Sequence, residues 1–110
     1  MTKERILEEL RKLKRVFEDP EIKTEFEYFN KTIQLTFPDI DVDAFLQIGN
    51  SAIDALGVGI AETEFGITMD SSVFFGILDN TIDSIEAYTS GKIVIKGDIP
   101  TLKKLKKLIL

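Results

Sequence analysis

The 110-residue sequence contains no cysteine and no histidine, and both absences narrow the chemistry that it can support. Without cysteine there can be no disulfide, no thiolate nucleophile and no zinc–thiolate site. Without histidine the chain lacks the commonest general base near neutral pH and the commonest transition-metal ligand. No uninterrupted apolar run approaches the roughly 20 residues that a membrane-spanning helix needs. These absences favour a binding or interaction protein over an enzyme.

Positive charge is also scarce, because 14 basic residues stand against 19 acidic ones and the net charge is -5. An acidic balance of this kind argues against a nucleic-acid partner. The first ten residues, MTKERILEEL, are too charged for a secretory signal, so we expect a cytoplasmic protein. With 44% apolar and 30% charged residues, the length suits one folded domain, residues 1–110.

The first half of the chain changes from a helical to a strand-like period near Lys31. A helix is predicted over residues 3–17, and a second helical segment from Pro20 to about Asn30. In the first helix an apolar stripe, with the charged residues opposite, is formed by Ile6, Leu7, Leu10, Leu13 and Phe17. Alternation then predicts strands at residues 31–37, 42–48, 52–60 and 64–69. The short turns between the first three strands imply an antiparallel meander.

In the second half we expect two short helices, a fifth strand and a closing helix. Asp70 suits an N-cap for a helix over residues 71–80, and the next helix, residues 81–90, ends before Gly91. Residues 92–98, KIVIKGD, alternate as a strand. The closing helix starts near Pro100 and is amphipathic. Its apolar face holds Leu102, Leu105, Leu108 and Ile109, and its basic face holds Lys103, Lys104, Lys106 and Lys107.

Signals for catalysis or metal binding are weak throughout. Asp39, Asp41 and Asp43 have the spacing of a calcium loop, but Ala44 and Asn50 stand where such a loop needs glycine and glutamate. The glycines of GVG, residues 57–59, are not followed by a helix that could receive a pyrophosphate. The serines have no histidine to activate them. We therefore predict no catalytic residue, no metal site and no cofactor.

Two amphipathic patterns each leave two interpretations open. The segment SSVFFGIL is apolar around more than half of its girth, because adjacent helical side chains point about 100° apart. It is either buried on two sides or lines an apolar cavity with one face. The lysines of the closing helix are either a solvated face or a basic patch that meets an anionic membrane surface.

Residues 65–108, FGITMDSSVFFGILDNTIDSIEAYTSGKIVIKGDIPTLKKLKKL, resemble the sterol carrier protein type-two family of lipid-binding domains. As in that family, a strand ends in an acidic, helix-capping segment, here residues 68–72. Two short helices follow, and the strand GKIVIKGD, residues 91–98, precedes a closing helix. The first half of the chain matches the family in the order of its elements only.

The resemblance implies an α+β fold in which a five-stranded, mainly antiparallel sheet carries helices packed on one face. An apolar cavity between these layers, covered by the C-terminal helix, would hold a fatty acid, fatty acyl-CoA, sterol or isoprenoid-like lipid without catalysis. The residues expected to contact the lipid are Phe74, Phe75, Leu78, Ile85, Ile93, Ile95, Leu102, Leu105, Leu108 and Ile109. The residues expected to contact a head group or membrane are Lys103, Lys106 and Lys107.

The alternative is a fully packed interaction module of the same fold, which would form a homodimer through a sheet edge or its last helix. An apolar cavity of several hundred Å³, the usual size of a small-molecule site, would favour the lipid-binding protein.

Overall fold

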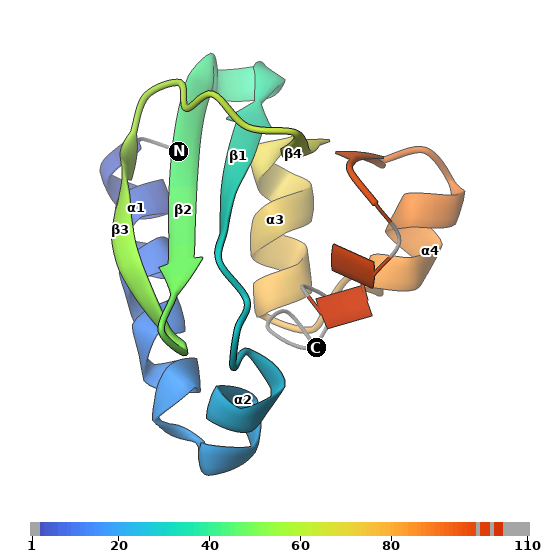
Figure 1. The fold of residues 1–110 in the computed structure, drawn as a ribbon. Coiled ribbons are helices and arrows are strands. Elements are labelled where there is room, and N and C mark those ends of the chain that lie inside the picture. The colour runs from blue at the N-terminus through green and yellow to red at the C-terminus, as the bar shows by residue number, and fades with distance from the viewer. Residues whose placement is uncertain (1–2, 99, 102, 105–110) are drawn as a thin grey trace.

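The computed structural model describes residues 3–98, 100–101 and 103–104. Its centre is a five-stranded sheet with the strand order β3-β2-β1-β4-β5 (Figure 1). The strands are β1 (Lys31–Phe37), β2 (Val42–Gly49), β3 (Ala52–Val58), β4 (Phe65–Met69) and β5 (Ile93–Lys96). The predicted α+β class with a five-stranded sheet is therefore confirmed.

The helices pack against one face of this sheet. They are α1 (Lys3–Lys12), the 3-10 turn η1 (Leu13–Glu18), α2 (Pro20–Glu25), the 3-10 turn η2 (Pro38–Ile40), α3 (Ser71–Leu78) and α4 (Ser84–Thr89). Helices α1 and α3 lie behind the sheet in the view of Figure 1. Phe37 of β1 packs on Phe74 of α3, with ring centroids 5.3 Å apart. Within the described ranges, the helices are all too short or too polar to cross a bilayer.

The sheet is mainly antiparallel, as expected, and has one parallel pair. Strands β1, β2 and β3 form the predicted meander, and β4 pairs with β5 in the antiparallel sense. Strand β4 lies parallel to β1 on the side away from β2. The connection over residues 59–64 therefore crosses β2 and β1 on the face of the sheet away from the helices (Figure 1).

Gln34 of β1 fastens this crossing connection to the sheet. Its amide nitrogen donates hydrogen bonds to the carbonyls of Ala44, at 2.8 Å, and Gly59, at 3.1 Å. Its amide oxygen accepts from the backbone N–H of Ala61 at 2.6 Å. One side chain thus binds backbone groups of the sheet and of the crossing connection together.

The core follows from the period-two pattern of the strands. Ile33 and Leu35 of β1 are buried, and their cross-strand partners in β2 and β4 are buried with them. Each fully buried large side chain of this kind contributes about 1.5–3 kcal/mol to the free energy of folding. The side chains that have lost nearly all contact with solvent are those of Phe26, Phe37, Ile6, Leu10, Ile33 and Ile48.

Several predicted boundaries were wrong, most clearly the end of the second helix. Helix α2 ends at Glu25, because Tyr28 has a φ of +64° and the Phe29 N–H donates to the Phe26 carbonyl in a turn. The ring centroids of Phe26 and Phe29 lie 5.2 Å apart across this turn, so their helix-like spacing comes from a turn. The first helix also tightens into η1, and β3 and β5 are shorter than predicted.

Candidate functional site

Helix α1 carries a charged side chain on the face that it turns toward the core. Glu9 is only 9% exposed, and its neighbours on that face, Ile6 and Leu10, are fully buried. Its carboxylate accepts a hydrogen bond from the Lys12 amine at 3.0 Å and lies 3.5 Å from the Arg5 guanidinium. The prediction that all charged residues of this helix lie opposite its apolar stripe was therefore wrong. A buried carboxylate needs such partners, because desolvation otherwise disfavours its charge.

The start of helix α3 is fixed from a distant turn. Asp70 occupies the N-cap position, as predicted, but its side chain makes no capping hydrogen bond. Asp39 of η2 caps the helix instead, since its carboxylate accepts from the Ser71 N–H at 2.8 Å and from the Ser71 hydroxyl at 2.6 Å. The Ser71 hydroxyl bond holds the pKa of Asp39 below its ordinary value. This contact joins the β1–β2 turn to α3.

The end of helix α3 is fixed by the turn that follows it. The Gly76 carbonyl accepts from the backbone N–H groups of Thr81, at 2.8 Å, and Ile82, at 3.0 Å. A Cβ on Gly76 would overlap the Ile82 side chain, so only glycine allows this approach. The Asp79 carboxylate accepts from the N–H and the hydroxyl of Thr81. Asp79 is thereby held just beyond the last turn of the helix.

A pocket of about 580 Å³ lies where α1 and the C-terminal half of α3 approach each other. It is lined by Arg5, Glu9, Lys12, Phe75, Leu78 and Asp79. Phe75 and Leu78 form an apolar wall, and the Arg5 guanidinium lies 5.4 Å from the centroid of the Phe75 ring. The volume falls within the range of small-molecule sites. The arrangement offers an apolar surface beside a polar rim.

Two of the residues predicted to contact lipid lie in this pocket, and three others lie elsewhere in the fold. Phe75 and Leu78 line it, whereas Phe74 is 5% exposed and packs between Phe37 and Phe75. Ile93 is buried on the inner face of β5, and Ile95 packs partly buried against the same core. The structure thus divides these predicted residues between the pocket wall and the packed core.

Ile85 of α4 is 50% exposed and does not line the pocket between α1 and α3. The remaining predicted lipid contacts, Leu102, Leu105, Leu108 and Ile109, and the predicted head-group residues Lys106 and Lys107 lie outside the described residues. Lys103 is described and is exposed.

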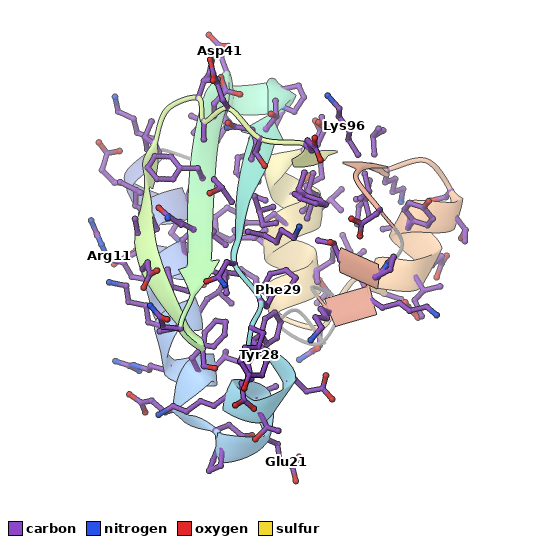
Figure 2. The ribbon with its side chains drawn as sticks, in the orientation of Figure 1. Arg11, Glu21, Tyr28, Phe29, Asp41 and Lys96 are labelled. Carbon is purple, nitrogen blue, oxygen red and sulfur yellow. The ribbon has the colours of Figure 1, made fainter. Side chains whose placement is uncertain are left out.

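The first turn of the closing helix is attached at two described points. Asp98 accepts from the Thr101 N–H at 2.7 Å, and Thr101 is 4% exposed. The Lys104 amine donates to the Glu25 carbonyl and lies 6.0 and 5.9 Å from the ring centroids of Phe26 and Phe29. Lys104 therefore ties this helix to the turn that ends at Phe29, the residue labelled in Figure 2.

Four pocket residues were not predicted from the sequence patterns, namely Arg5, Glu9, Lys12 and Asp79. One signal was available, because Glu9 lies three residues after Ile6 and so falls on the apolar stripe of its helix. Its partners stand four residues before it and three residues after it, the spacings at which helical side chains meet. Asp79 gave no comparable signal.

The aspartates whose spacing resembled a calcium loop do not converge on one point. The Asp39 carboxylate is engaged by Ser71, and Asp41 lies at the tip of the β1–β2 turn, pointing away from the sheet (Figure 2). Across the ranges the structure describes, three or more acidic side chains nowhere come together as metal ligands.

These features define a two-layer α+β domain with an apolar-walled pocket in its helical layer. The model of the SCP-2 sterol transfer family matches residues 9–110. The chain belongs to this family, and the resemblance seen in its second half is confirmed. No curated protein sequence shows a significant match to the chain.

Solved structures of low sequence identity share the fold. A crystal structure of sterol carrier protein 2 is 20% identical, with a TM-score of 0.69, over 90% of this chain and 85% of that one. A palmitated sterol carrier protein 2-like protein from Aedes aegypti is 18% identical, with a TM-score of 0.69, over 91% and 89% of the two chains.

The fold also occurs as part of a larger enzyme. A stereoselective inverting sec-alkylsulfatase from a Pseudomonas species is 19% identical, with a TM-score of 0.64, over 79% of this chain. The matching region is 13% of the sulfatase, so this chain corresponds to a small part of that protein.

Proposed function

We propose that the protein binds a lipid and transfers it, with the acyl or isoprenoid chain against the apolar wall of the α1–α3 pocket. The observation that carries this proposal is the pocket itself, in which Phe75 and Leu78 stand beside charged residues of α1. Membership of the SCP-2 sterol transfer family supports it, as does a neighbour of the same fold that is described with bound palmitate.

In this proposal the affinity comes from burial of the apolar chain of the lipid. Each methylene group removed from water contributes about 0.8 kcal/mol, so a long chain needs few polar contacts. Ile93 and Ile95 would extend the apolar surface along the inner face of the sheet. Leu102, Leu105, Leu108 and Ile109 would cover the bound chain, which makes the closing helix a lid.

The proposed role is binding without catalysis. Of the two pocket carboxylates, Glu9 is engaged by Lys12 and Arg5, and Asp79 accepts hydrogen bonds from Thr81. Contacts of Lys103, Lys106 and Lys107 with a head group or an anionic membrane stay a prediction.

Titration of delipidated protein with a fluorescent acyl probe tests the proposal. We expect saturable binding that unlabelled lipid of the same chain length displaces, and a co-purified lipid in native mass spectra of the untreated protein. A probe that shows no saturable, displaceable binding would overturn the proposal and favour the packed interaction module.

A further inference from the structure

The charges that line the pocket balance one another. Arg5 and Lys12 supply two cations, and Glu9 and Asp79 supply two carboxylates, so the formal charge of the lining at neutral pH is zero. The surrounding protein is acidic, with a net charge of -5. Within the described residues, the pocket lining therefore offers no excess positive charge to an anionic head group.

Glu9 is the residue that sets this balance. Arg5 and Lys12 are more than half exposed as side chains, whereas the Glu9 side chain is 11% exposed between them. Its charge acts at short range on both cations, at 3.5 and 3.0 Å, in surroundings that are partly shielded from water. A second negative charge brought to the same cations by a ligand would have to compete with this carboxylate.

The remaining polar capacity of the rim suits hydrogen bonding. Lysine carries three N–H donors, so Lys12 can donate to a neutral oxygen while it stays paired with Glu9. The Arg5 guanidinium is also oriented by the Phe75 ring, at 5.4 Å from its centroid. A hydroxyl, ester or carbonyl head group would be recognised here without bringing a charge of its own.

We infer that the pocket selects lipids with an uncharged polar head group over fatty acids, and over fatty acyl-CoA most strongly, and that Glu9 determines this selectivity. The inference rests on the proposed function, because it concerns which lipid the same pocket takes. It narrows the ligand classes that the sequence left open, since acyl-CoA carries several negative charges.

Three ligands with the same 16-carbon chain test the inference by displacing an uncharged fluorescent acyl probe. They are monopalmitoylglycerol, palmitate and palmitoyl-CoA, which differ in head-group charge. At neutral pH and low salt, we expect the affinity to fall in that order for the wild-type protein. We expect Glu9→Gln to raise the affinity for palmitate and palmitoyl-CoA about five- to tenfold relative to the uncharged lipid.

Glu8→Gln is the matched control. Glu8 neighbours Glu9 in α1 but is exposed, so this variant changes the net charge equally and leaves the pocket lining unchanged. Lys12→Gln should move the selectivity in the opposite direction, with Lys14→Gln as its exposed control. Circular dichroism melting shows whether each variant is folded. If Glu9→Gln does not fold, Lys12→Gln compared with Lys14→Gln still tests the inference.

The outcomes separate the inference from the proposed function. If all three ligands displace the probe equally, or if Glu9→Gln and Glu8→Gln change selectivity alike, the inference is overturned while lipid binding stands. If none of the three lipids binds, the proposed function is overturned and the inference with it.

Discussion

Asp39 shows how a single side chain positions an element of the candidate site. It caps α3 from 32 residues away through two hydrogen bonds to Ser71, and α3 carries Phe75 and Leu78 into the pocket. The spacing of the three aspartates in this turn indicated only an exposed acidic segment, because sequence alone does not bring η2 to the start of α3. The same limit explains why Asp70 was expected to be the capping side chain.

We predict that Asp39→Asn lowers the free energy of unfolding at pH 7 by about 1 kcal/mol, because hydrogen bonds to a charged carboxylate contribute more than hydrogen bonds to a neutral amide. The pKa of Asp39 is lowered in the folded protein by the Ser71 hydroxyl bond, so its carboxylate stabilises the fold above its unfolded pKa of about 3.9. That contribution is lost as the pH falls through the folded pKa.

Urea unfolding of the wild-type protein and Asp39→Asn between pH 7 and pH 2 measures this effect. The gap between the two proteins should be constant near neutral pH and should shrink below about pH 4. Asp41→Asn, at the exposed tip of the same turn, is the control and should leave stability almost unchanged. A gap that persists undiminished at pH 2 would show that Asp39 does not act through its charge.

The turn of the chain at Phe29 illustrates what periodicity can predict about an element. Spacing alone made Phe26 and Phe29 look like the next turn of a helix, but Tyr28 takes a left-handed conformation between them. Phe26 is then fixed by edge contacts with Phe17 and Phe29, at 5.2 Å each. Apolar residues three apart fit both a helix and a tight turn, so only the tertiary contacts distinguish the two.

The closing helix is the element whose attachment can be tested directly. If it covers the bound chain, weakening the contact of Lys104 with the Glu25 carbonyl and the Phe26 and Phe29 rings should let it open more often. We predict that Lys104→Gln speeds release of the acyl probe several-fold, since a cation–π contact contributes about 0.5–1 kcal/mol. The melting temperature should change little.

Stopped-flow displacement measures the release rate, and Lys92→Gln provides the control. Lys92 is exposed and is not among the residues expected to contact the lipid, so its loss should leave release unchanged. Equal release rates for the wild-type protein and both variants would mean that the Lys104 contact does not limit exit of the ligand.

At the scale of the whole molecule, strand identities could be predicted from sequence, but one strand pairing could not. Alternation identifies the five strands, and short turns imply the meander, because neither depends on distant contacts. The parallel pairing of β4 with β1 requires residues 59–64 to cross two strands, a span of roughly 14 Å at the usual spacing between strands. Six residues can cover that distance or simply extend the meander, so length did not distinguish the alternatives.

Only the α3 wall of the candidate site could be predicted, because the α1 wall depends on contacts between distant parts of the sequence. Phe75 and Leu78 could be found because a helix apolar around most of its girth must bury a second face. The opposite wall comes from α1, more than 60 residues away in the sequence, and its contact with α3 is set by the complete packing of the helical layer. Glu9 was expected on the charged face of α1, although its spacing from Ile6 places it beside the apolar stripe.

The measurement that tests lipid binding at this site most directly is titration of an acyl probe into Leu78→Trp and Ile85→Trp. Both positions were predicted to contact lipid, but Leu78 lines the pocket whereas Ile85 is half exposed on α4. A tryptophan at position 78 should narrow the pocket at its apolar wall and weaken binding at least tenfold, which corresponds to about 1.4 kcal/mol. The same change at position 85 should leave both affinity and melting temperature close to wild type. Wild-type affinity in a folded Leu78→Trp variant, or a loss confined to Ile85→Trp, would contradict binding between α1 and α3.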